Sequence, residues 1–326
     1  MAAGLVPRVF AAPAAGGWDV AKIEGRDYVS VEGIKRFYKF TKLTRSGGNI
    51  TLENAKVLMR LKVGGNECLM NNVKFVFSNS VEAMGAKTYV SRVDLAKLID
   101  PVLRPNFIKN AGDFKTVIID PGHGGKDPGA TNSLGTEAGY NIRLATRVKA
   151  LLQRKGFKVI LTRDSDVYLS LQERVVLANT IKDSAIYISL HFNSGGPAAR
   201  GIETFTLSPP GVSHYGAHFK ASDNQTRAGN EHDSANIALA TSIHGSILRR
   251  LGRNSFDRGI KRARFSVLSG VNHPAILLEG GFMSHPNEAR LIAAEPYQAA
   301  LGAGIVDAVE KYRFAVGRPV LATKKN

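Results

Sequence analysis

The chain has 326 residues, and 44% of them are hydrophobic, which is enough for two domains that each bury a core. Its single cysteine, Cys68, excludes an intramolecular disulfide framework and a cysteine-rich zinc module, so any metal must have nitrogen and oxygen ligands. The net charge of +17 favours an anionic partner, but the basic residues are scattered without an aromatic-basic pattern, so we expect no nucleic acid. The sequence contains no run of about 18 apolar residues, so we expect no transmembrane segment.

Residues 1–17 precede the first predicted element and admit two interpretations. Their small side chains suit a signal cleavage site, whereas Pro7 and Arg8 interrupt the apolar segment that a signal peptide needs. A signal-peptide remnant and a disordered tail therefore both remain open.

Residues 18–105 are predicted to form a small α+β domain. Apolar and polar residues alternate over 56–63, and a second apolar run over 73–77 continues a meander of strands. Ser30 and Ser91 each stand between a Tyr-Val pair and an amphipathic helical segment, which is the position of an N-cap. This arrangement resembles the copper-amine-oxidase N-terminal-like domain, an accessory module of bacterial envelope enzymes, although this part of the chain has no histidine to bind copper.

After a linker at residues 106–114, the pattern changes to alternating strands and helices. We expect strands over residues 116–119, 157–161, 185–190, 201–207, 265–268 and 275–278, and helices over 141–152, 170–178, 236–251 and 297–312. Such alternation implies an α/β fold with a mostly parallel central sheet flanked by helices on both faces. This second domain spans residues 115–313, and residues 314–326 are expected to form a C-terminal tail.

Two segments of the second domain have no predicted helix or strand. The basic run 258–262 is interpreted as a solvated loop or as a contact for peptide carboxylates. The polar insertion 208–234 lacks an apolar helical face, so we expect a mobile loop on the substrate side rather than a helix that occludes the site.

Three polar side chains follow apolar runs of the predicted sheet. They are His123, His191 and Glu279. Because ligands collect beyond the carboxyl ends of parallel strands, these side chains are expected to converge at one edge. Two imidazoles and a carboxylate form a normal zinc shell that leaves a fourth position for water, and zinc would activate that water and polarise a carbonyl group. A further carboxylate must carry the proton to the leaving nitrogen, and Glu279 is placed for that role.

Glu137 opens the helix that follows the His123 loop. A carboxylate at a helix N-terminus is favourable electrostatics in any protein, so this position alone explains Glu137 at least as well as metal ligation does. Both interpretations remain open from the residues themselves.

Seven short motifs follow one another in the second domain: Asp120–Gly129, Glu137, Thr162–Asp166, Leu171–Asn179, Ser189–Asn193, Gly201–Thr204 and Leu278–Ser284. In this order they resemble the zinc-dependent N-acetylmuramoyl-L-alanine amidases, a family of cell-wall hydrolases. The resemblance covers residues 115–313 and implies that this segment is the catalytic domain.

The resemblance also implies roles for individual residues. His123, Glu137 and His191 match the family's zinc ligands, and Glu279 matches its catalytic glutamate. Asn193 and Arg174 are candidates for contacts with the substrate or for support behind the ligands, and Arg174 could equally do no more than buttress its own helix.

The implied activity is zinc-dependent hydrolysis of the amide bond between N-acetylmuramic acid and L-alanine in peptidoglycan. The expected partners are peptidoglycan and anionic envelope polymers, and we expect a periplasmic or secreted monomer. Two alternatives remain, namely a zinc peptidase or amidase that acts on another peptide and a non-catalytic regulator that binds the cell wall.

Overall fold

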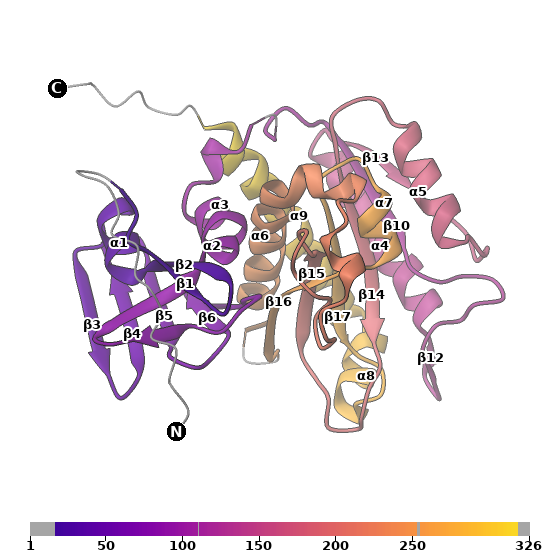
Figure 1. Cartoon of the computed structure of the whole chain (residues 1–326). Helices are drawn as coiled ribbons and strands as arrows, with labels where there is room; N and C mark the ends of the chain where they lie inside the picture. The colour runs from indigo at the N-terminus through magenta and orange to yellow at the C-terminus, as the bar shows by residue number, and fades with distance from the viewer. Residues whose placement is uncertain (1–16, 110, 253–254, 319–326) are drawn as a thin grey trace. The chain divides into compact units, whose positions relative to one another are not determined.

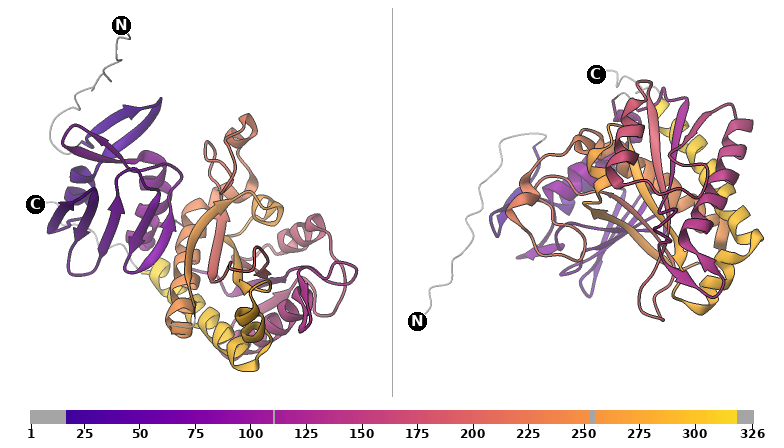
Figure 2. Two further views of the ribbon diagram at one scale, coloured as in Figure 1. Left: turned by 90° about the horizontal axis from the view of Figure 1, so that it is seen from below. Right: turned by 90° about the vertical axis from the view of Figure 1, so that its right-hand side faces the viewer.

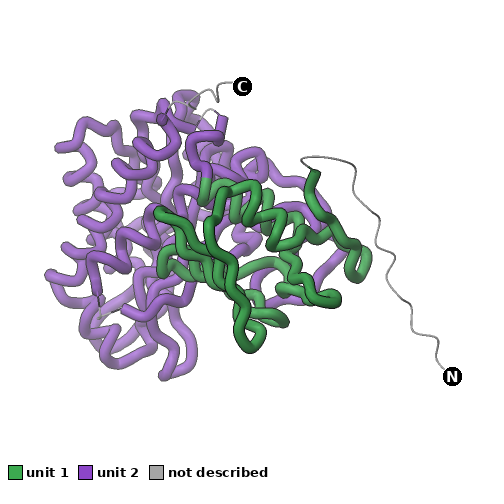
Figure 3. Tube along the Cα trace, turned by 90° about the vertical axis from the view of Figure 1, so that its left-hand side faces the viewer, with its two compact units in different colours: residues 1–103 green, residues 104–326 purple. Residues whose placement is uncertain are grey.

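The computed structural model describes residues 17–109, 111–252 and 255–318 of the chain (Figure 1). The chain divides into two compact units, Met1–Leu103 and Arg104–Asn326 (Figure 3). Apart from Gly17, the segment for which a signal remnant or tail is predicted lies outside the described residues. The predicted linker lies at the start of the second unit.

The first unit contains two antiparallel arrangements of strands. Four strands pair in the order β1-β2-β9-β8, and strands β3 to β7 form a meander in sequence order. The Ser30 and Ser91 side chains cap helices as predicted, because they accept hydrogen bonds from the backbone N–H groups of Gly33 and Asp94. The elements are β1 (Val20–Ile23), β2 (Arg26–Ser30), α1 (Val31–Phe37), β3 (Lys42–Ser46), β4 (Asn49–Glu53), β5 (Leu58–Lys62), β6 (Glu67–Met70), β7 (Val73–Val76), β8 (Glu82–Met84), β9 (Lys87–Ser91), α2 (Arg92–Asp94), the π-helix η1 (Leu95–Ile99) and α3 (Asp100–Leu103).

The second unit alternates strands and helices along most of its length. Its elements are the 3₁₀ helix η2 (Pro105–Phe107), β10 (Thr116–Pro121), β11 (Thr131–Asn132), β12 (Gly135–Thr136), α4 (Glu137–Arg154), β13 (Lys158–Leu161), α5 (Leu171–Thr180), β14 (Ala185–Asn193), β15 (Ile202–Leu207), the 3₁₀ helices η3 (Ala221–Asn224) and η4 (Ala228–His232), α6 (Asp233–Leu251), β16 (Asp257–Ala263), α7 (Ser266–Gly270), β17 (Ala275–Phe282), α8 (Pro286–Ala293) and α9 (Glu295–Gly317). A capping box formed by Ser170 and Glu173 opens α5.

The sheet of the second unit is mixed. Its strand order is β13-β10-β14-β17-β15-β16, and the pairs β13/β10, β10/β14, β14/β17 and β15/β16 are parallel. The pair β15/β17 is antiparallel, so the sheet departs from the predicted parallel arrangement at this point. The physical reason is the connection 194–201, which is too short to carry the crossover that would set β15 parallel to β14.

Helices cover both faces of this sheet (Figure 2). Helices α4, α6 and α9 pack against one another and against the central strands on one face. On the opposite face, residues of five strands share a core with α5 and α7, and this core includes Ile118, Tyr187, Phe205, Leu277, Val175 and Leu268. Among the described residues, no helix is both long and apolar enough to cross a membrane.

Several predicted boundaries are wrong. The segment 265–268, predicted as a strand, belongs largely to the short helix α7, and the basic run 258–262, predicted as a loop, lies in strand β16. Helix α9 continues to Gly317, so residues 314–317 are not a tail, and residues 319–326 lie outside the described part of the chain.

The insertion 208–234 carries η3 and η4 and is tied to the end of β16. The guanidinium of Arg264 donates to Asp223 Oδ1 at 2.8 Å and to the carbonyl oxygens of Ser208 at 3.2 Å and Pro209 at 3.1 Å. One arginine therefore anchors the first half of the insertion through both backbone and carboxylate acceptors.

Candidate metal centre

The first histidine lies in a sharp turn after strand β10. His123 has φ +60°, a left-handed conformation that is uncommon for a residue with a side chain, and Gly124 and Gly125 continue the turn with positive φ values. Gly122 is in close contact with the second histidine, because a Cβ atom there would lie 2.1 Å from His191 Cε1. The glycines of this motif therefore allow the two imidazole rings to approach each other.

This contact predicts the effect of Gly122→Ala. A Cβ atom 2.1 Å from the ring forces His191 to move by about 1 Å, because real Cβ atoms keep at least 3.0 Å from their neighbours. We expect metal affinity to fall by more than about 10-fold, as measured by metal content after dialysis. Gly196→Ala is the matched control, since a Cβ atom there meets nothing within 4 Å. Equal metal content in the two variants would contradict the prediction.

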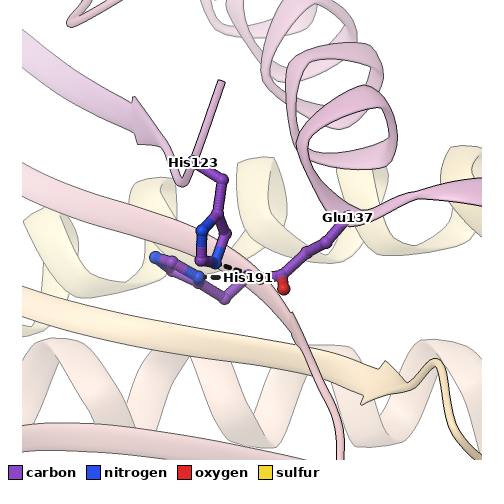
Figure 4. Close-up of side chains that lie close together, drawn as sticks. All are labelled: His123, Glu137 and His191. Atoms are coloured by element: carbon purple, nitrogen blue, oxygen red, sulfur yellow. Dashed lines mark hydrogen bonds and ion pairs between the residues drawn. The ribbon is translucent and has the colours of Figure 1, made fainter. Parts of the chain in front are cut away.

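Glu137 is the first residue of α4 and lies between the two histidines. Its Oε1 atom is 2.8 Å from His191 Nδ1 and 3.1 Å from His123 Nε2 (Figure 4). The same carboxylate accepts hydrogen bonds from the backbone N–H groups of Phe192 at 3.2 Å and Ala130 at 3.0 Å. The carboxylate is thus fixed by backbone donors on both sides and directed at the imidazoles, which a residue that merely caps its helix does not require.

The electrostatics of this cluster favour a cation at its centre. Burial raises the pKa of Glu137, but hydrogen bonds from His123 and His191 outweigh it and hold this pKa well below its ordinary value. Burial lowers the pKa of His123, whereas the carboxylates of Glu137 and Asp127 raise it, and their effect prevails. The carboxylate is therefore ionised and concentrates negative charge between two nitrogen ligands.

The donor set fits a divalent metal such as zinc. One ligand atom from each of His123, Glu137 and His191 lies within 4.8 Å of the others, and within the described ranges this is the one such group of three. His123 Nδ1 is 2.8 Å from Asp127 Oδ2, a contact that leaves Nε2 free to face Glu137. A Cβ atom on Gly129 would lie 2.6 Å from Glu137 Oε2, so the backbone here also leaves room for the cluster.

Glu279 lies in the middle of β17, beside the cluster. It is the register partner of His191 on β14 and of Glu203 on β15, so the three side chains share one face of the sheet. Within the described residues its Oε2 atom has no hydrogen-bond partner. Burial, and then the charges of Glu137 and Glu203, raise the pKa of Glu279 well above its ordinary value.

Glu279 shares a cavity of about 370 Å³ with His123 and His191. Its walls come from the segment before α5, which includes Tyr168, and from the segment that leads into α7, which includes Phe265. The described residues of the insertion 208–234 contribute none of this lining. The cavity therefore exposes the histidines and the Glu279 carboxyl group to the same small volume.

Strands β14 and β17 extend past these residues. The apolar runs predicted His191 and Glu279 at strand ends, but β14 continues to Asn193 and β17 to Phe282. The two strands stay paired through a bulge between His191 and Asn193, which explains why the polar side chains do not end the strands.

Arg174 and Asn193 have protein partners. Arg174 is buried and donates to Asp120 Oδ1 at 2.7 Å and to the carbonyl oxygens of Pro121 at 2.8 Å and His123 at 2.7 Å. It therefore supports the histidine loop as well as its own helix. Asn193 donates to Glu203 Oε1 at 2.7 Å.

Several buried polar residues around the site are not identified by the sequence analysis. Glu203 is buried beside Glu279 and pairs with Lys261, which is also buried, although Lys261 belongs to the run predicted as a loop. Arg163 and Asn141, buried behind the His123 loop, were not singled out. Residues 259–263 of β16 are all buried, so this strand has no alternation of buried and exposed positions that would have marked Lys261 in the sequence.

The chain is similar to several known proteins. Residues 117–311 match the Amidase_3 family, described as N-acetylmuramoyl-L-alanine amidase. The Bacillus subtilis protein YqiI is 30% identical over 198 residues, which cover 61% of this chain and 84% of YqiI. The N-acetylmuramoyl-L-alanine amidase AmiC of Neisseria meningitidis is 28% identical over 240 residues, which cover 67% of this chain and 57% of AmiC.

The chain is also similar to a solved structure. The crystal structure of N-acetylmuramoyl-L-alanine amidase from Clostridium difficile 630 is 33% identical, with a TM-score of 0.50, and the match covers 61% of this chain and 97% of that one. The family match extends over more than half of the chain and includes each residue of the His-Glu-His cluster and Glu279. The chain therefore belongs to the N-acetylmuramoyl-L-alanine amidase family.

Proposed function

We propose that the chain hydrolyses the amide bond between N-acetylmuramic acid and L-alanine in peptidoglycan, with one zinc ion bound by His123, Glu137 and His191. The observation that carries the proposal is the convergence of these three ligand atoms beside Glu279, a half-buried residue that lines the same cavity. This arrangement lies wholly within the segment that matches the amidase family.

The chemistry divides between the metal and the protein. When bound, zinc would lower the pKa of a water molecule to about 7 and polarise the scissile carbonyl group. The Glu279 carboxylate accepts the proton of the attacking water and then delivers it to the leaving nitrogen of L-alanine. The raised pKa of Glu279 suits this task, because the group must hold the proton between the two steps. Asp127 orients the His123 ring throughout.

The remaining expectations follow from the substrate. Peptidoglycan lies in the cell envelope, so we propose that the protein acts in the periplasm or after secretion. We also propose that it acts as a monomer. The net charge of +17 suits contact with anionic envelope polymers. We assign catalysis to residues 115–313 and an accessory role to residues 18–105.

Digestion of purified sacculi tests this function. Mass spectrometry of the products should show intact stem peptides with a new L-alanine N-terminus. A chelator should abolish the reaction, and added zinc should restore it. Cleavage within the stem instead would favour a zinc peptidase, and binding of sacculi without release of peptides would favour a non-catalytic regulator.

A further inference from the structure

The backbone just before His123 is held by two buried side chains. Arg163 donates from Nε to Pro121 O at 2.9 Å and from Nη2 to Gly122 O at 2.8 Å. The same Gly122 carbonyl accepts from Asn141 Nδ2 at 3.2 Å. Asn141 is fully buried and Arg163 is 3% exposed, so water does not replace these donors readily.

Both donors also connect this loop to the helix that carries Glu137. Arg163 Nη2 donates to the carbonyl oxygen of Ala138 at 3.0 Å, one residue beyond Glu137. Asn141 itself belongs to α4 and lies four residues after Glu137, on the same side of the helix. Two side chains therefore join the element that carries one nitrogen ligand to the element that carries the carboxylate.

The segment between the two elements is bound to the start of α4 by short-range hydrogen bonds, from Glu137 N to Ala130 O at 2.8 Å and from Ala138 N to Pro128 O at 3.0 Å, but it does not hold the His123 turn by itself. His123 has the disfavoured φ of +60°, which surrounding contacts must maintain. Between His123 and Glu137 the chain forms only the two-residue strands β11 and β12. Contacts from outside this segment therefore add to the local ones in setting the distance from His123 Nε2 to Glu137 Oε1. Arg174 holds only the loop, whereas Arg163 and Asn141 connect the loop to α4.

We propose that Arg163 and Asn141 are positioning residues that fix His123 relative to Glu137 and thereby set the affinity of the site for a divalent metal. The inference rests on the proposed function in one respect, namely that a zinc ion occupies these ligands. It does not depend on the substrate.

The test measures zinc affinity of the full chain by competition with a chromogenic chelator. Arg163→Lys keeps the charge but loses the planar set of guanidinium N–H donors, and Asn141→Ala removes the side-chain amide that donates to Gly122 O. We expect each variant to bind zinc about 10–100-fold more weakly than wild type and to show an altered absorption spectrum with Co²⁺. Arg250→Lys is the control, because Arg250 pairs with Asp307 at the surface of the same unit.

Three outcomes separate the possibilities. The inference would be overturned if the variants bound zinc within twofold of wild type and kept the Co²⁺ spectrum, while their metal-free forms melted at a lower temperature. That result would show that the two residues only support the fold. Should Arg163→Lys fail to fold, Asn141→Ala decides between these results by itself. Wild-type protein that binds no zinc would defeat the proposed function, whereas tight wild-type binding with unchanged variants defeats only this inference.

Discussion

Glu279→Gln is expected to lower the rate of sacculus hydrolysis by about 10²–10⁴-fold, the usual contribution of a general acid–base group. Glutamine has the same shape but cannot take the proton of the attacking water. Because Glu279 is the register partner of His191 rather than a member of the ligand cluster, zinc content should stay near one per chain. Rate assays and metal analysis on the same preparation measure both effects.

The same variant should not lose stability. The Glu279 Oε2 atom has no hydrogen-bond partner within the described residues, and burial raises the pKa of this group, so its charged form is unfavourable where it lies. A neutral amide removes that cost, and we expect a melting temperature equal to or above that of wild type.

The control for this prediction is Glu231→Gln, which changes an exposed glutamate of the same unit. It should keep both activity and zinc. Substantial hydrolysis by Glu279→Gln, or loss of its zinc together with its activity, would assign the proton transfer to another group.

Much of the second unit could be predicted from periodicity, but the direction and class of some elements could not. The run at 116–119 consists of β-branched residues, the run at 185–190 spans six residues, and both form strands. The run 265–268 is too short for periodicity to distinguish a strand from a helix, and it enters α7. The antiparallel direction of β15 depends on the length of a connection, which the hydrophobic pattern does not encode.

The candidate site was predictable where side chains bear the chemistry and unpredictable where backbone groups do. His123 and His191 stand out because imidazoles are rare beside apolar strands. Glu137 could not be separated from a helix cap until the fold brought the start of α4 beside β14. Arg163 and Asn141 bind carbonyl oxygens, which every residue has, so their partners leave no mark in the sequence.

The second prediction with a large expected effect concerns the ion pair of Asp120 and Arg174, which is buried beneath the His123 loop. Asp120 and Arg174 are 1% and 3% exposed and lie 2.7 Å apart, and Asp120 also accepts hydrogen bonds from Thr162 and Ser189. Asp120→Asn leaves the Arg174 charge buried without its counter-ion, which should lower the free energy of unfolding by about 3–5 kcal/mol. Urea unfolding at pH 7 measures the change, and Asp164→Asn, an exposed aspartate nearby, should change it little.

The pair also predicts how wild-type stability depends on pH. Burial alone would raise the pKa of Asp120, but Arg174 and the hydrogen bond from Thr162 lower it below its ordinary value of 3.8. The unfolded chain therefore takes up this proton first, so the stabilisation is complete above pH 3.8 and is lost as the pH falls through the lower pKa of the folded state. Asp120→Asn should lack this part of the acid dependence. If the unfolding free energies of wild type and Asp120→Asn ran parallel from pH 7 to pH 2, Asp120 would not be the ionised partner of Arg174, and the support of the His123 loop would have to come from Arg174 hydrogen bonds to backbone carbonyls alone.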